Sequence, residues 1–110
     1  YPEAHRWVNT LGFVDFHAVC CFTCGSIHAG LGEKFQLRDL PVALECVRSI
    51  AEPCIAYKIM GAGRIDARMA FEYAFTHIKP GDVVNVGMYR KDKDDMVEEN
   101  AGLVREFLSR

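Results

Sequence analysis

Hydrophobic and polar positions repeat one pattern three times along the chain. An apolar run of strand length comes first, a loop rich in glycine or polar residues follows, and a segment with apolar positions at helical spacing completes the unit. The apolar runs cover residues 13–22, 54–60 and 83–88. Alternating strands and helices are typical of a parallel sheet, because parallel strands need a crossover connection. The pattern therefore predicts an α/β fold.

Start and stop residues bound each of the three predicted helices. One begins near Asp39 and ends before Pro53, the second begins near Asp66, and the third begins near Asp95. Glu98 follows Asp95 at the spacing of a capping box, in which each side chain bonds to the backbone of the other residue. These boundaries predict three helices that each return the chain to the next strand or to its end.

A sheet of three parallel strands leaves two open edges and two faces to be covered. The chain also begins at Tyr1 inside a helical pattern over residues 5–11, which resembles the tail of an amphipathic helix. We therefore expect residues 1–110 to be one piece of a larger domain. The rest of that domain, or another chain, would cover the sheet edges.

Composition indicates a folded protein without affinity for nucleic acid or membranes. Half of the residues are hydrophobic, a quarter are charged, and the formal net charge is -2. The basic residues are scattered, so no positive surface for nucleic acid is predicted. No apolar run approaches the roughly 20 residues of a spanning helix. Together with five cysteines in an α/β pattern, these features predict a cytoplasmic protein with reduced thiols.

Three of the cysteines lie within residues 20–24, where Cys21 and Cys24 form a C-x-x-C pair close to His17 and His28. Such a pair can act as a redox dithiol or contribute to a metal site. A single pair is weak evidence for zinc, and a buried cysteine is a common small hydrophobic residue in strands. We therefore favour structural thiols and predict no metal site.

Strand alternation identifies the candidate catalytic side chains. With a period of two, Asp15, His17, Lys58 and Asn85 form a polar set that we expect on one face of the sheet. Lys58 has apolar neighbours and must find an anion or lose its charge. His17 can instead be interpreted as a buried histidine whose ring is hydrogen-bonded to a backbone carbonyl. Lys58 and His17 are the catalytic candidates within this chain.

The loops after the second and third strands have the composition of anion sites. Glycine lets backbone N–H groups approach an anion, a helix N-terminus adds partial positive charge, and arginine adds forked donors. The residues concerned are Gly61, Gly63 and Arg64 after the second strand and Gly87, Met88, Tyr89 and Arg90 after the third.

Residues 55–63, 82–88 and 96–100, in this order and spacing, resemble the last part of aldo/keto reductases and their barrel relatives. The resemblance implies a (β/α)8 TIM-barrel fold, of which this chain would be the C-terminal fragment from strand 6 to helix 8. It implies that the loops named above bind the phosphates of NADPH or NADH. Glu99 and Asn100 match the family's pair that contacts the adenine.

The resemblance also implies what this chain lacks. The family's catalytic Asp, Tyr, Lys and His lie on earlier strands, so the chain alone would not reduce its small carbonyl substrate. The family's basic position for the 2′-phosphate falls near Asp94 or Asp95, which leaves the choice between NADPH and NADH open. Two other functions remain open. Lys58 is a candidate Schiff-base nucleophile on a sugar phosphate, as in class I aldolases, and the chain is also compatible with a ligand-binding barrel fragment without catalysis.

Overall fold

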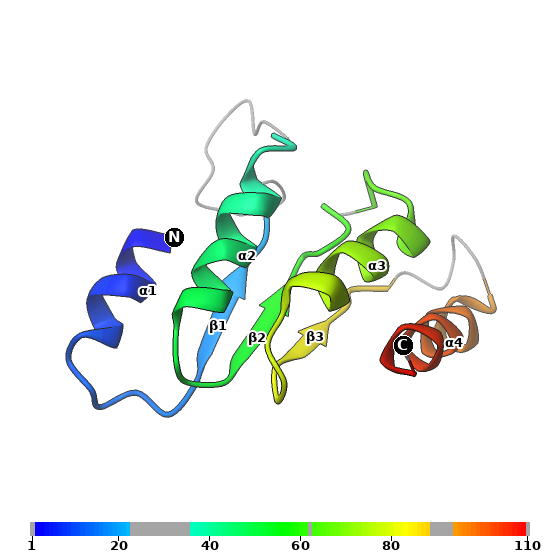
Figure 1. Cartoon of the computed structure of the whole chain (residues 1–110). Helices are drawn as coiled ribbons and strands as arrows, with labels where there is room; N and C mark the ends of the chain where they lie inside the picture. The colour runs from blue at the N-terminus through cyan, green and yellow to red at the C-terminus, as the bar shows by residue number, and fades with distance from the viewer. Residues whose placement is uncertain (1, 23–35, 62, 89–93, 110) are drawn as a thin grey trace.

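A computed structural model of the chain describes residues 2–22, 36–61, 63–88 and 94–109. Three parallel strands form one sheet in the order β1-β2-β3 (Figure 1). These strands are β1 (His17–Cys20), β2 (Cys54–Tyr57) and β3 (Val83–Asn85). Within the described ranges the helices are α1 (Pro2–Asn9), α2 (Asp39–Ser49), α3 (Ala67–His77) and α4 (Met96–Leu108).

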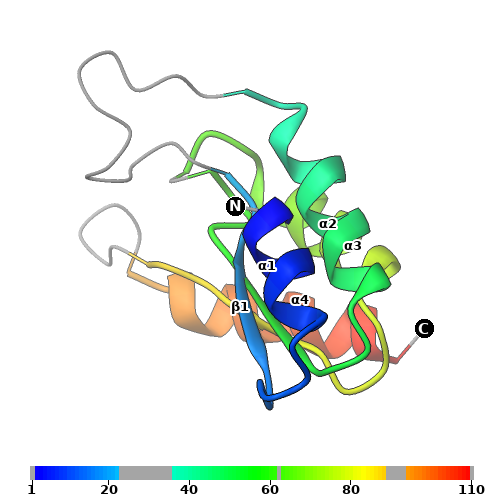
Figure 2. The same cartoon turned by 90° about the vertical axis from the view of Figure 1, so that its left-hand side faces the viewer.

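Helices α1, α2 and α3 lie on one face of the sheet, and α4 lies beyond β3 next to α3 (Figures 1 and 2). Burial alternates along β1 accordingly, since His17 and Val19 are buried while Ala18 is exposed. On the opposite face Val83 and Asn85 are exposed. The described part of the sheet therefore has one well-covered face and one more open face.

The hydrophobic core fills the space between the covered face and the helices. Its largest fully buried side chains include Phe22, Leu44, Ile59 and Phe71. α4 extends this core through Leu103 and Phe107, and the Arg68 guanidinium of α3 pairs with Glu106 and lies 5.5 Å from the centre of the Phe107 ring.

Asp82 ties the start of β2 to the connection between α3 and β3. One carboxylate oxygen accepts a hydrogen bond from the Cys54 backbone N–H at 2.8 Å. The other accepts from the backbone N–H and from Nζ of Lys79, at 2.8 and 2.9 Å. Because its side chain is almost fully buried, Asp82 holds the amino-terminal edge of the sheet together.

The prediction of a (β/α)8 TIM-barrel fragment is wrong. The described residues form a small α/β unit with an open sheet of three parallel strands and four helices. The physical reason is that a repeated strand, loop and helix pattern is local, whereas barrel closure depends on strand number, tilt and stagger. The α/β class itself is confirmed.

The predicted elements exist, with two local differences. The helices begin within a residue of their predicted starts, while each strand is shorter than its apolar run. The predicted capping box at Asp95 is absent, because the Asp95 side chain makes no capping hydrogen bond. None of the described helices combines the length and the apolar character needed to cross a membrane.

Candidate functional site

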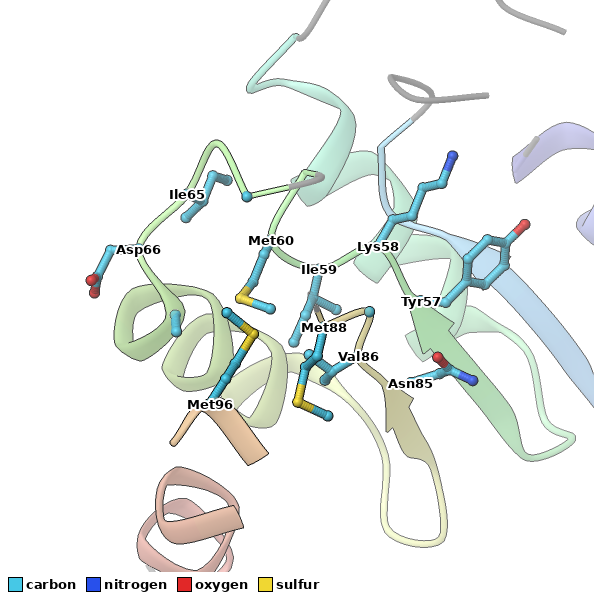
Figure 3. Close-up of a pocket in the computed structure, with 13 residues that line it drawn as sticks. Tyr57, Lys58, Ile59, Met60, Ile65, Asp66, Asn85, Val86, Met88 and Met96 are labelled. Atoms are coloured by element: carbon cyan, nitrogen blue, oxygen red, sulfur yellow. The ribbon is translucent and has the colours of Figure 1, made fainter. Parts of the chain in front are cut away.

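The carboxyl ends of β2 and β3 border a cavity of about 660 Å³ (Figure 3). The loop between β2 and α3, the segment after β3 and the first residue of α4 complete its wall. Its lining residues, grouped by segment, are Tyr57, Lys58, Ile59, Met60, Gly63, Ile65, Asp66 and Ala67, then Asn85, Val86, Gly87 and Met88, and finally Met96.

Three methionines give the cavity an adaptable apolar lining. Met60, Met88 and Met96 gather between the carboxyl end of β2 and the start of α4 (Figure 3). Methionine is flexible and polarizable, and its sulfur makes favourable contacts with aromatic rings. A lining of this kind suits a flat or aromatic part of a ligand.

Residues 58–60, 63 and 65, between β2 and α3, form one side of the cavity, and the described part of this loop contains backbone turns. The N–H of Gly61 donates to the Lys58 carbonyl at 3.0 Å, and the N–H of Ile65 donates to the Met60 carbonyl at 3.0 Å. Gly61 and Gly63 have φ angles of 57° and 85°, which glycine adopts without steric cost. Lys58 has a φ of 59°, so a residue with a Cβ occupies a left-handed conformation at the cavity wall.

At the start of α3, some of the groups that were predicted to bind an anion are already hydrogen-bonded within the chain. Asp66 caps α3, because its carboxylate accepts from the Met69 backbone N–H at 3.2 Å. Arg64 turns back onto its own loop and donates to the Gly61 carbonyl at 3.1 Å. The Arg64 guanidinium therefore stabilises the loop, and Asp66 places a negative charge where an anion was expected.

A polar row crosses the open face of the sheet beside the cavity. In the strand register Cys20 pairs with Tyr57, and Tyr57 pairs with Asn85. Tyr57 and Asn85 point away from the three methionines (Figure 3). Burial, and then the neighbouring Cys20 thiol, raise the pKa of the Tyr57 hydroxyl above its ordinary value.

The structure brings only some of the predicted cofactor-binding residues to the cavity. Gly63, Gly87 and Met88 line it, as does the catalytic candidate Lys58. Gly61 shapes the adjoining loop. Three further residues do not line the cavity, and these are Arg64, Glu99 and Asn100. Tyr89 and Arg90 lie outside the described residues.

Asn100 lies on the buried side of α4 with Leu103 and Phe107. Its side-chain nitrogen is buried and has no hydrogen-bond partner among the described residues. Glu99, in contrast, is exposed. The neighbouring positions 99 and 100 therefore point to different environments, as expected for consecutive residues of a helix.

The expectation that Asp15, His17, Lys58 and Asn85 share a face is wrong for His17. His17 pairs with Cys54 and is buried on the helix-covered face, where its Nδ1 lies 3.0 Å from Nδ1 of His5 in α1. Asp15 precedes β1 and Lys58 follows β2. His17 therefore belongs to the packing between α1 and β1, away from the cavity.

The described thiols are placed as structural groups. Burial raises the pKa of the Cys21 thiol to about 12, so it stays protonated and unreactive at neutral pH. The other half of the C-x-x-C pair, Cys24, lies outside the described residues, as does His28. Within the described ranges, no three or more His, Cys, Asp or Glu side chains are grouped to hold a metal ion.

Several lining residues were not predicted as site residues, in particular Tyr57, Met60 and Met96. Methionine and aromatic side chains at strand ends are usually assigned to the core, so the sequence carried no specific signal for them. Comparison of the chain with protein-family models, with curated proteins and with solved structures finds no match.

Proposed function

We propose that this chain binds a nicotinamide nucleotide, NADPH or NADH, in the cavity at the carboxyl ends of β2 and β3. In this proposal it is the cofactor-binding part of an oxidoreductase that acts on a small carbonyl substrate. The observation that supports it best is that the two loops predicted to bind the cofactor both contribute walls to one cavity. In open parallel sheets, ligands commonly bind at the carboxyl ends of the strands.

The size and lining of the cavity support a ligand of this class. A volume of about 660 Å³ lies within the usual range for sites that bind small organic molecules. The methionines offer polarizable contacts to an aromatic ring such as nicotinamide or adenine. Asn85, Tyr57 and Lys58 supply hydrogen-bonding groups at its edge.

The charged side chains among the described lining residues favour a ligand whose phosphates make few direct contacts with these residues. Lys58 is the one cationic residue among the described lining residues, and Asp66 places an opposite charge on the same wall. We therefore assign the described wall to the organic part of the nucleotide and only Lys58 to its phosphates.

The class I aldolase function of Lys58 on a sugar phosphate is less well supported. The lysine lines the cavity and has an unusual backbone conformation, both of which are found at catalytic positions. Its ammonium group, however, points away from Met60, Met88 and Met96 (Figure 3). A Schiff base within the methionine-lined space would require the side chain to turn round.

A leucine at position 87 tests the proposal by filling the cavity. A Cβ at Gly87 would meet no atom within 4 Å, so the fold should accept the change. The larger side chain would occupy ligand space, and we expect Gly87→Leu to weaken NADPH or NADH binding about tenfold or more, which is about 1.4 kcal/mol. Isothermal titration calorimetry of the purified chain with each nucleotide measures this.

Gly102→Leu is the matched control. Gly102 also has no atom within 4 Å of a Cβ, and it lies in α4 outside the cavity lining. Its replacement should leave nucleotide affinity unchanged. If the unsubstituted chain binds neither NADPH nor NADH, or if both variants bind equally well, the proposal is wrong.

A further inference from the structure

A pair of histidines joins α1 to the sheet. Nδ1 of His5 lies 3.0 Å from Nδ1 of His17, and the two rings meet edge to face with centroids 5.2 Å apart. This distance is that of a hydrogen bond between two nitrogens, one of which must carry a proton while the other accepts it. The contact therefore requires at least one neutral imidazole.

The burial of His17 restricts which ring nitrogens of the pair can carry a proton. His17 is 4% exposed, and its Nε2 is buried without a partner among the described residues. A proton on Nδ1 of His5 removes the acceptor for the Nδ1–H of His17, unless the His17 proton moves to Nε2. At Nε2 the donor would be buried and unsatisfied, which is costly. The neutral pair is thus the arrangement that the site accommodates best.

The ionisable groups around the pair offer little compensation for an added positive charge. The nearby thiols are Cys54 of β2, which pairs with His17 in the sheet, and Cys46 of α2, which bonds to Pro2 of α1; burial raises the pKa of both, so they are neutral.

Charged groups lie further out. Glu3 and Arg6, the charged side chains of α1, are both exposed, and beyond Cys54 Lys79 is already paired with Asp82. Burial first, and then the charge interaction with His17, lower the pKa of His5.

Helix α1 is held by few other interactions. None of its described residues is buried, and the Cys46 thiol of α2 donates a hydrogen bond of 3.6 Å to its Pro2 carbonyl. An element with little buried surface opens at low free-energy cost. A single hydrogen-bonded pair can therefore decide whether such a helix stays docked.

We propose that the His5–His17 pair is a pH-sensitive latch that docks α1 at neutral pH and releases it in mild acid. Because His5 binds a proton less readily in the docked state than in the released one, docking is complete above the ordinary histidine pKa of about 6.5. Docking is lost as the pH falls from that value towards the lower pKa of the docked His5. Release exposes the covered face of β1 and the neighbouring face of α2.

Trp7 reports directly on this movement. It is the one tryptophan of the chain and lies on α1, two residues after His5, with 66% of its surface exposed. We expect its fluorescence anisotropy to fall in a step with a midpoint below about pH 6.5. Far-UV circular dichroism should retain most of its signal through this step, because the other helices stay folded. All samples contain EDTA, so that a bound metal ion cannot cause the step.

His5→Gln is the decisive variant, since glutamine can still hydrogen-bond to His17 but cannot be protonated. We expect the anisotropy step to disappear in His5→Gln. It should remain in the control His77→Gln, because His77 bonds to the Tyr73 carbonyl within α3. In the unsubstituted chain, the ring proton signals of His5 should titrate together with the Trp7 step.

Three results would overturn the latch. One is a step that persists unchanged in His5→Gln, and another is a step that coincides with the loss of the far-UV signal. The third is a step that requires zinc in place of EDTA, which would assign the two histidines to metal binding.

Discussion

Among the described residues that carry a Cβ, Lys58 is the one with a positive φ. Its φ of 59° lies in the left-handed region, which costs such residues roughly 1–3 kcal/mol. The conformation follows from its place, because the chain leaves β2 at Tyr57 and must turn at once so that the Lys58 carbonyl accepts from Gly61. The strain is therefore stored in the wall of the cavity.

Replacing Lys58 separates the backbone cost from the loss of the side chain. Lys58→Gly and Lys58→Ala both remove the side chain, but only glycine adopts a positive φ freely. We expect the glycine variant to be more stable than the alanine variant by about 1 kcal/mol. Urea unfolding monitored by circular dichroism measures the difference. Equal free energies of unfolding would show that Lys58 has an ordinary backbone conformation in solution.

The first residues of α3 and α4 show how much of a helix start can be predicted from the local sequence. Both α3 and α4 are preceded by an aspartate, but only the side chain of Asp66 accepts a hydrogen bond from its helix. Its backbone is extended with ψ at 135°, as a capping residue requires, whereas Asp95 has ψ at 18° and its side chain makes no capping hydrogen bond. The same residue type at the same position therefore has different effects on the two helices.

This contrast predicts different costs for two identical substitutions. Asp66→Ala should lower the free energy of unfolding by about 1 kcal/mol, because it leaves the Met69 N–H without its acceptor. Asp95→Ala should change it by less than about 0.5 kcal/mol, since no capping bond is lost. Thermal and urea unfolding of the two variants test this, and a larger loss for Asp95→Ala would contradict the assigned helix starts.

At the level of the whole molecule, the sheet has two unequal faces. Parallel sheets usually bury both of their faces, yet in the described part of this chain α1, α2 and α3 all lie on the same side (Figure 2). Val19 of the covered face is 1% exposed, whereas Val83 of the opposite face is 51% exposed. This asymmetry brings Tyr57 and Asn85 to a solvent-accessible surface beside the cavity.

Two matched substitutions measure the asymmetry. Threonine has nearly the shape of valine but carries a hydroxyl group, which is costly only where it is buried without a partner. We expect Val19→Thr to cost about 1–3 kcal/mol of unfolding free energy and Val83→Thr less than about 0.5 kcal/mol. Similar large losses for both variants in urea unfolding would mean that the second face is also covered in solution.

Part of the candidate site followed from the sequence because it depends on neighbouring residues. Gly63 and Gly87 were identified from their positions in the loops after apolar strands, and Lys58 from the alternation within a strand, and all three line the cavity. Arg64 was assigned to an anion, but its guanidinium reaches the carbonyl of Gly61 three residues earlier. The direction of a long, flexible side chain depends on which hydrogen-bond acceptors lie near it in the folded loop, and these cannot be read from the sequence.

The sequence by itself determined the order of elements, the α/β class and the places where α2, α3 and α4 begin, because hydrophobic periodicity and helix-start residues act over a few positions. Only the tertiary structure decided that the sheet stays open, that His17 meets His5 on the covered face, and that Met60, Met88 and Met96 share one cavity. A period of two separates the faces of a strand without saying which face the helices cover. That choice depends on how distant segments pack together.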